Sequence, residues 1–170
     1  ALKFAKSKGA KTAAIVNVMG SSISRLVDKV ILQGSGPEIC VISTKAAFAQ
    51  MITLTILALK LSLKKKKIKR RDYDASLTAL RELPEVIQNV LNERSGFIHR
   101  IANNYSNVKN WLYLGRGIYY PIALESALKM KEVAYVHAEG MPGGFLKHGT
   151  LAMIDQNVNS IVFIPPCSDK

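Results

Sequence analysis

The sequence predicts an α/β fold in which helices pack against parallel β-strands, and three observations lead to this prediction. The short apolar run KTAAIVNV at 11–18 shows little alternation, which is typical of a strand buried on both faces, and WLYLG at 111–115 also predicts a strand. A turn and a helical segment follow each run, as expected of a parallel sheet. A long helical stretch separates the two. We therefore predict two α/β segments, 1–63 and 108–170, joined by a helical connector at 64–107.

The composition is that of a globular protein with an excess of positive charge. Of 170 residues, 48% are hydrophobic and 21% are charged, which argues against disorder. There are 24 basic and 12 acidic residues, and a net charge of +12 favours nucleic acids, membrane surfaces or phosphorylated metabolites as partners. The two cysteines, Cys40 and Cys167, are far apart in the chain. We expect both to be reduced thiols in a cytoplasmic protein, with no metal site.

The first α/β segment begins with the end of an amphipathic helix at 1–8, which Gly9 ends. The strand at 11–18 follows, then a short helix from about Ser22 and a second strand, KVILQG. The serines of VMGSSIS either bind an anion at the start of that helix or only cap it.

A long helix is predicted over STKAAFAQMITLTILALKLSLKKKKIKRR, with Ser43 or Thr44 as its N-cap. Its uncharged stretch between Lys45 and Lys60 has 14 residues, whereas a membrane span needs about 20. We therefore expect a buried core or dimer helix. The basic run KKKKIKRR at 64–71 is interpreted as a solvated face because it lacks the interleaved aromatic residues of a nucleic-acid site.

The connector is predicted to be helical at ASLTALRELPEVIQNVLNER, with Pro84 marking a break or the start of a second helix. A further short helix is expected at GFIHRIANNYSN, where His99 is interpreted as structural.

The second α/β segment is predicted to begin with the strand at 111–115 and the tight turn GRG. A helix with Pro121 in its first turn then runs to about Ala138. GMPGG is expected to be a flexible turn, FLKHGTLAMID helical or irregular, and NSIVFIPP a buried strand. The turn LGRGIYY lacks the third glycine of a dinucleotide site. His137 is either catalytic or a core histidine with one hydrogen bond.

Candidate chemistry is concentrated on the helix that follows the GRG turn. Glu125, Lys129 and Glu132 share one face because they lie at i, i+4 and i+7. They form either a solvated salt-bridged stripe or part of a site. A site is favoured because the helix begins beyond the carboxyl end of a strand, where open α/β sheets bind ligands. Glutamate and histidine transfer protons near neutral pH, and Lys147 and His148 follow in a glycine-rich segment.

Three stretches together resemble the isomerase module of the glutamine:fructose-6-phosphate amidotransferase (glucosamine-6-phosphate synthase) family. They are LGRGIYYPIALESALKMKEVAYVHAEGMPGGFLKHGTLAMID, GSGPEICVISTKA and AIVNVMGSSISRLVD. The resemblance implies two sugar-isomerase (SIS) subdomains, each a nucleotide-binding-like three-layer sandwich around a parallel sheet. Residues 1–63 resemble the second half of the first subdomain, and residues 108–170 the first half of the second.

The same resemblance implies roles for five residues in making glucosamine 6-phosphate from fructose 6-phosphate and ammonia. Glu132 matches the base that moves a proton between sugar C1 and C2, and His148 the histidine that assists ring opening across a dimer interface. Lys129 matches a lysine of the same active site. Val41 and Ser43 match residues that line the sugar pocket. Each acid or base contributes about 10²–10⁴-fold to such a reaction.

The sequence departs from the family pattern at several positions. Phe145 replaces the glutamate of Gly-Glu-Leu-Lys-His-Gly, Cys40 stands where glycine is usual, and Ala47-Phe48-Ala49 replaces a stretch with two threonines. The family's phosphate-binding serine/threonine loop is expected before residue 1 and its Schiff-base lysine beyond residue 170. We therefore expect residues 1–170 alone not to complete the reaction.

The resemblance further predicts a cytoplasmic, homodimeric enzyme of amino-sugar synthesis that binds a sugar phosphate and uses no cofactor. It predicts a glutaminase domain in the full-length chain, and neither nucleic acid nor a membrane as a partner. One alternative is an SIS protein without the amidase: a deglycase, an isomerase or a sugar-phosphate-binding regulator. An alternative of another class is a basic module that binds nucleic acid or a membrane surface through residues 64–71, with strong salt dependence.

Overall fold

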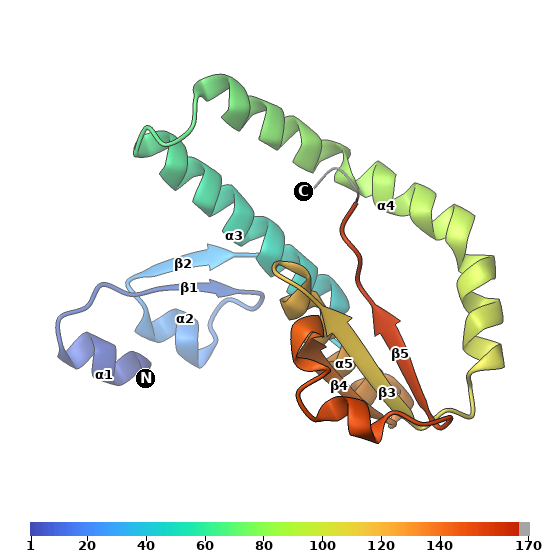
Figure 1. The fold of residues 1–170 in the computed structure, drawn as a ribbon. Coiled ribbons are helices and arrows are strands. Elements are labelled where there is room, and N and C mark those ends of the chain that lie inside the picture. Colours follow the sequence, from blue (N-terminus) through green and yellow to red (C-terminus); the bar gives the residue numbers. More distant parts are fainter. Residues whose placement is uncertain (167–170) are drawn as a thin grey trace. The chain divides into compact units, whose positions relative to one another are not determined.

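The computed structural model describes residues 1–166, so Cys167 lies outside the described residues. The chain divides into two compact units, Ala1–Asn92 and Glu93–Lys170 (Figure 1). Each unit contains parallel strands and helices, which confirms the predicted α/β class. The finer division at 63/64 and 107/108 stays a prediction.

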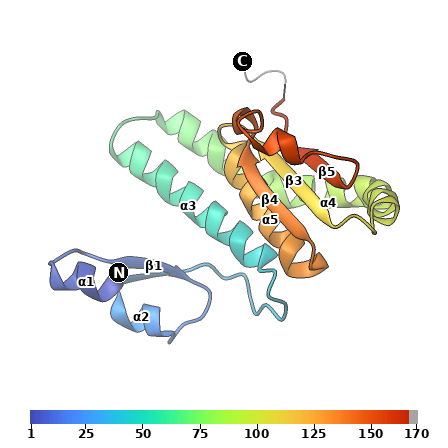
Figure 2. The same cartoon turned by 60° about the horizontal axis from the view of Figure 1, so that its bottom comes forward.

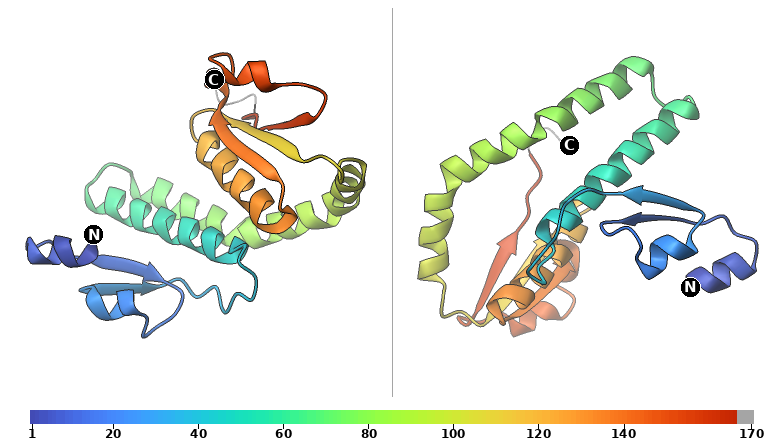
Figure 3. Two further views of the ribbon diagram at one scale, coloured as in Figure 1. Left: turned by 90° about the horizontal axis from the view of Figure 1, so that it is seen from below. Right: turned by 180° about the vertical axis from the view of Figure 1, so that it is seen from behind.

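The first unit contains a two-stranded parallel sheet (Figure 3). Ala13 of the first strand lies opposite Lys29 of the second. Its order of helix, strand, helix and strand is the predicted one. Gly9 adopts a φ of +76° directly after the first helix, as a terminating glycine should. The elements of this unit are α1 (Leu2–Ser7), β1 (Ala13–Val16), α2 (Ser22–Leu26), β2 (Lys29–Leu32), α3 (Thr44–Lys64) and the first part of α4 (Arg70–Asn104).

A cluster around Asp28 joins α1 to the starts of β1 and β2. One carboxylate oxygen accepts from the Thr12 backbone N–H at 2.8 Å and from the Thr12 hydroxyl at 2.9 Å. The other accepts from the Lys6 ammonium at 2.9 Å. The hydrogen bond from Lys6, followed by those from Thr12, lowers the pKa of Asp28 to about 2 because each stabilises the carboxylate. The cluster therefore stabilises the fold only while Asp28 is ionised.

The second unit contains a three-stranded parallel sheet with the order β4-β3-β5, against which α5 packs (Figure 2). Seven of the nine buried apolar side chains among the described residues belong to this unit. The central strand β3 is buried from Trp111 to Gly115. Its elements are β3 (Asn110–Gly115), α5 (Tyr119–Ala134), β4 (His137–Pro142), the 3₁₀ turns η1 (Gly143–Phe145) and η2 (Thr150–Met153), and β5 (Val158–Val162).

The prediction of a helix to Ala138 followed by a flexible GMPGG turn was wrong, because residues 137–142 form the strand β4. Glycine, proline and glutamate are poor strand formers, so HAEGMP gave no strand signal. Packing against α5 explains the strand. Ala138 and Ala123 are fully buried, and a Cβ added at Gly140 would lie 2.6 Å from the Cα of Leu124. The face of β4 that packs against α5 therefore requires small residues. Because these are not the β-branched or aromatic residues typical of strands, no sign of a strand is visible in the sequence here.

Pro84 does not interrupt the connector, which was also predicted incorrectly. A single helix, α4, runs from Arg70 to Asn104 and includes the GFIHR segment expected to be separate. A proline in a helix removes one backbone hydrogen bond. The helical spacing of the exposed apolar residues Val86, Val90 and Leu91 nevertheless continues beyond Pro84. A second correction concerns β5, which is only partly buried because it forms an edge of the sheet described here.

The helix α3 was expected to be a buried core helix or a dimer helix, and the first alternative is wrong because Ala46 is its only buried residue. By length and composition alone it qualifies as a membrane-spanning helix, a test that core helices of soluble proteins also pass. The accessible surface is 13013 Å². Two separate compact units totalling 18.7 kDa would expose roughly 10,000 Å². The excess consists partly of apolar side chains around α3, and a helix that is apolar on all sides is normally covered.

Candidate active site

The helix α5 holds two of the three candidate catalytic residues, Lys129 and Glu132, and close packing fixes its position on the sheet. It contacts β3 and β4, with Ala123 and Ala127 almost fully buried against Trp111 and Tyr113. Small residues at the contact allow the helix backbone to approach the strands closely. The helix is therefore a rigid support for the polar side chains on its outer face.

Lys129 forms ion pairs with both glutamates of the predicted stripe. Its ammonium lies 2.7 Å from Oε2 of Glu132 and 3.4 Å from Oε1 of Glu125. The Lys129 and Glu132 side chains are 19% and 27% exposed, whereas Glu125 is 48% exposed. The hydrogen bond with Glu132 raises the pKa of Lys129, which keeps the ammonium charged beside the carboxylate. Glu132 is thus the oriented carboxylate, and Glu125 is a more solvated second partner.

Glu132 does not lie at the carboxyl edge of the sheet, where a ligand site was predicted. The helix does begin at the carboxyl end of β3, beside Gly115. Glu132, however, lies on the last turn of α5, which leads back to the start of β4 at His137. Because β3 and β4 are parallel, with Asn110 opposite His137, this end of the helix lies at the amino edge of the sheet. The general preference of ligands for the carboxyl edge therefore does not explain Glu132.

His148 follows β4 and η1, so its loop leaves the carboxyl edge of the same sheet. The imidazole and the Phe145 ring are 6.0 Å apart in an edge-on arrangement, and the His148 backbone N–H donates to the Phe145 carbonyl at 2.9 Å. A six-residue strand spans about 20 Å. Phe145 and Lys147, which flank His148, line a hollow at the carboxyl edge, whereas Glu132 lies on the turn of α5 that leads to the amino edge.

Ser43 occupies the N-cap position of α3 but does not cap the helix with its side chain. It adopts a left-handed conformation with φ of 53°, which is costly for a residue with a Cβ. Glu38 supplies the cap instead, since its Oε1 accepts from the Ala46 backbone N–H at 3.3 Å. The Ser43 hydroxyl makes no hydrogen bond to any residue between 1 and 166.

Val41 lies two residues before Ser43 and is 74% exposed. The surrounding segment borders a hollow of about 290 Å³ lined by Pro37, Glu38, Ile39, Cys40, Ile42, Thr44 and Lys45. Cys40 is exposed and free, so the side chain that replaces the usual glycine is accommodated without a clash. Val41 and Ser43 belong to the first unit, and Lys129, Glu132 and His148 belong to the second.

A second hollow, at the carboxyl edge of the three-stranded sheet, was not predicted as a whole. It measures about 760 Å³ and combines the basic residues Arg116 and Lys147 with Tyr120 and a glycine-rich backbone. Two stretches of the sequence contribute to this hollow. LGRG was interpreted only as a weak dinucleotide motif, and Lys147 was noted only as the neighbour of His148. Phe145 lines this hollow and is 66% exposed, so the residue that replaces the usual glutamate adds an apolar surface.

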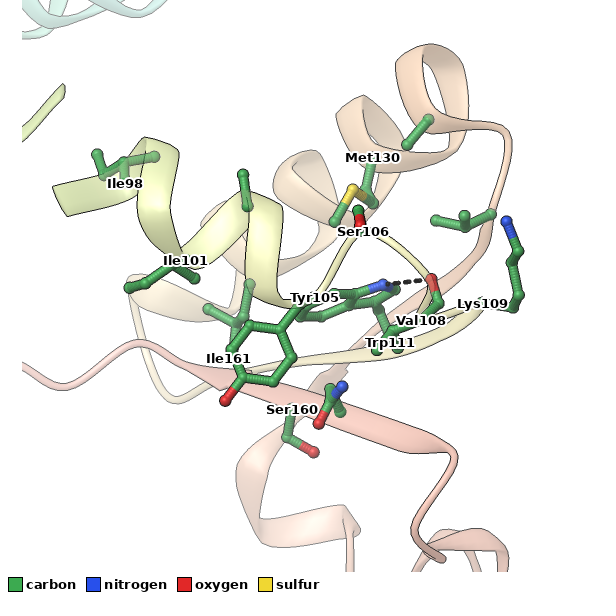
Figure 4. Close-up of a pocket in the computed structure, with 14 residues that line it drawn as sticks. Ile98, Ile101, Tyr105, Ser106, Val108, Lys109, Trp111, Met130, Ser160 and Ile161 are labelled. Carbon is green, nitrogen blue, oxygen red and sulfur yellow. Dashed lines mark hydrogen bonds between the residues drawn. The ribbon is translucent and has the colours of Figure 1, made fainter. Parts of the chain in front are cut away.

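An apolar cavity of about 500 Å³ lies between the end of α4, α5 and the strands β3 and β5 (Figure 4). Tyr105 and Trp111 meet edge to face in its wall, with ring centroids 6.2 Å apart, and the indole N–H donates to the Val108 carbonyl. None of the predicted catalytic residues lines it. It is therefore separate from the candidate active site.

The two remaining histidines also have clear surroundings. His137 is not a core residue, because its side chain is 52% exposed and its Nε2 lies 3.4 Å from the Glu139 carboxylate. His99 lies on α4, with Nδ1 3.2 Å from the Asn103 amide. His99 thus contacts its own helix, as a structural residue would.

Comparison with known proteins shows several to which this chain is similar. Residues 104–166 match the family model described as the SIS domain. Among solved structures, the C-terminal domain of glucosamine-fructose-6-phosphate aminotransferase from Francisella tularensis is similar, with a TM-score of 0.91 and 34% identity. The alignment covers 97% of this chain and 46% of that one.

Curated relatives extend the similarity beyond the SIS domain. The chain is 45% identical over 170 residues to a glutamine–fructose-6-phosphate aminotransferase (isomerizing) from Methanococcus maripaludis. It is 44% identical over 156 residues to the protein of the same name from Caldanaerobacter subterraneus. These matches cover 100% and 92% of the chain but only 27% and 26% of the relatives. The chain thus spans about a quarter of the length of these relatives.

Proposed function

We propose that this chain forms part of an isomerising glutamine:fructose-6-phosphate aminotransferase, which makes glucosamine 6-phosphate from fructose 6-phosphate and ammonia. The Lys129–Glu132 pair on α5 is the observation that supports this proposal most directly. The names of the relatives supply the substrate class. The pair supplies an oriented base on a helix that is held rigidly against the sheet.

Converting a ketose into an aldose requires a proton to move between two adjacent carbon atoms. We assign this transfer to the Glu132 carboxylate, which takes the proton from sugar C1 and returns it to C2. Lys129 holds the carboxylate in position through the 2.7 Å hydrogen bond to Oε2. A base held in this way contributes about 10²–10⁴-fold to the rate.

His148 assists opening of the sugar ring in this proposal, and it acts in the site of a second subunit. The placement of the segment around His148 toward the carboxyl edge and of Glu132 toward the amino edge supports this arrangement. A symmetric homodimer allows each copy to give His148 to its partner and to receive the partner's in return. The proposed enzyme is therefore a dimer in which each active site contains residues of two chains.

Ser43 and Val41 line the sugar pocket in this proposal. The strained backbone of Ser43 and its unengaged hydroxyl support a role in binding, because such strain is concentrated at ligand sites. The glutaminase domain and a cytoplasmic location belong to the same proposal. They rest on the kind of enzyme that the relatives are named for.

The test uses the whole protein as its own cells produce it, supplied with fructose 6-phosphate and either glutamine or ammonium. Glucosamine 6-phosphate formation is measured for the wild type and for Glu132→Gln. The expected result is a loss of at least about 100-fold in kcat for Glu132→Gln. The matched control is Glu125→Gln, which removes the weaker and more exposed partner of Lys129 and should retain most activity. Equal losses in both variants, or no product from the wild type, would refute the proposal.

A further inference from the structure

The turn that joins α3 to α4 carries the highest concentration of charge in the chain (Figure 1). We call it the basic turn; its charged members are Lys64, Lys65, Lys66, Lys67, Lys69, Arg70 and Arg71. All seven side chains are exposed. Residues 60–74 hold eight basic and two acidic side chains, Asp72 and Asp74. Both acidic side chains lie on the first turns of α4.

Little within the described chain neutralises these charges. Arg70 forms an ion pair with Asp74 at 2.9 Å. The other six basic residues of the turn have no ion pair or side-chain hydrogen bond to any residue from 1 to 166. The basic turn therefore presents six cations that are free to meet an external anion.

The backbone holds these cations together. The Lys67 N–H donates to the Ser62 carbonyl at 2.8 Å and the Lys66 N–H to the Leu63 carbonyl at 3.0 Å, which is the hydrogen-bond pattern of a Schellman C-cap. Lys66 takes the left-handed position of this cap with φ of 55°, where glycine is favoured. A lysine is thus present at a position where glycine would fit with less strain.

Apolar side chains adjoin the cations. Leu57 and Leu61, on the last two turns of α3, are 38% and 54% exposed, and Ile68 lies within the basic turn. A basic cluster beside exposed leucines is typical of contact with an anionic bilayer surface. A single-stranded nucleic-acid site would also offer aromatic rings for stacking. The nearest ring, that of Tyr73, is 8% exposed and lies under Arg70.

We propose that the basic turn binds the surface of an anionic lipid bilayer, with its lysines at the headgroup phosphates and Leu61 at the boundary of the acyl chains. The binding is peripheral and does not require α3 to cross the membrane. It involves none of the residues assigned to catalysis. The sequence alone favoured a solvated face for residues 64–71, and the unpaired cations beside exposed leucines are what change that interpretation.

The test is sedimentation of the whole protein, purified as its own cells produce it, with two kinds of vesicle. One kind is phosphatidylcholine alone, and the other contains about one-third phosphatidylserine. The protein should sediment with the anionic vesicles only, and less as salt rises. The triple variant Lys64→Gln, Lys65→Gln and Lys67→Gln should bind about a hundredfold more weakly, since each lysine contributes about fivefold. The matched control removes the same charge from exposed lysines of the first unit: Lys3→Gln, Lys11→Gln and Lys29→Gln.

Two single variants distinguish loss of vesicle binding from the effects of misfolding and from binding to a nucleic acid. Lys66→Gly should bind anionic vesicles about fivefold more weakly while its melting temperature rises or stays unchanged, because glycine relieves the left-handed strain. Leu61→Asn should weaken vesicle binding without affecting binding to single-stranded RNA. If RNA binds more tightly than vesicles and Leu61→Asn changes neither, the partner is a nucleic acid and the lipid proposal fails. Absence of vesicle binding at physiological salt overturns it as well.

Discussion

The Lys129 ammonium bridges Glu132 at 2.7 Å and Glu125 at 3.4 Å, and the nearer glutamate is also the more buried one. This difference allows two carboxylates on one helix face to be given different roles.

The placement of Glu132 and of the segment around His148 toward opposite edges of the sheet predicts complementation between inactive subunits. Glu132→Gln and His148→Ala homodimers should both lose at least about 100-fold in kcat. In a mixed dimer, one site receives both intact residues and the other receives neither. Random mixing should therefore restore about a quarter of wild-type activity.

Glucosamine 6-phosphate formation by subunits mixed after dissociation measures this effect. The control is a mixture of Glu132→Gln subunits with the double variant that carries both substitutions, which contains no complete site. If mixing restores nothing although exchange of subunits is demonstrated, His148 does not act across the interface.

The strained backbone of Ser43 predicts that replacing Ser43 with glycine maintains or raises the melting temperature but weakens binding of the sugar phosphate. Ser43→Gly keeps the left-handed conformation without a Cβ penalty, so its melting temperature should equal or exceed that of the wild type. Both Ser43→Gly and Ser43→Ala should raise KM for fructose 6-phosphate about three- to tenfold, the effect of one lost hydrogen bond.

Thr55→Ala is the control, because the Thr55 hydroxyl donates to the Met51 carbonyl within α3. Steady-state kinetics and thermal melting of the three variants provide the comparison. An unchanged KM in Ser43→Gly contradicts the assignment of this hydroxyl to the sugar pocket.

The Asp28 cluster predicts loss of stability in acid. The folded-state pKa of about 2 lies below the ordinary value of 3.8, so the contribution of Asp28 is complete above about pH 4 and disappears as the pH falls toward 2. Asp28→Asn should melt at a lower temperature than the wild type at pH 6, and the difference should narrow toward pH 2. Asp72→Asn, which removes a carboxylate without an ion pair among the described residues, should behave like the wild type throughout. A constant difference across this range would exclude Asp28 as the titrating group.

The contact between Gly140 and α5 predicts a steric penalty. A Cβ at Gly140 would lie 2.6 Å from the Leu124 backbone, so Gly140→Ala should lower the free energy of unfolding by about 1–3 kcal/mol. Gly144→Ala is the matched control, because nothing lies within 4 Å of its added Cβ. Urea unfolding of the two variants measures the difference, and equal midpoints would mean that the contact adjusts at little cost.

Some features of the site and the fold were predictable from the sequence, and others were not. The pairing of Lys129 with Glu125 and Glu132 follows from helical spacing alone and was predictable. The strand β4 was not, because its alanine and glycine are explained only by the helix that packs on them. The capping of α3 by Glu38 was not predictable either, because Glu38 lies eight residues before Ala46, outside the usual N-cap position. Hydrophobic periodicity describes one helix or strand at a time. The strand β4 and the cap of α3 both depend on contacts with another segment of the chain.

The exposed apolar surface of α3 affects how the protein behaves while it is being made. A newly synthesised copy presents Phe48, Met51, Leu54 and Leu57 to solvent until another surface covers them. In the crowded cell, chaperones recognise such surfaces and proteases remove the chains that remain uncovered. The abundance of the protein should therefore follow the supply of whatever covers α3, so that copies made in excess are degraded.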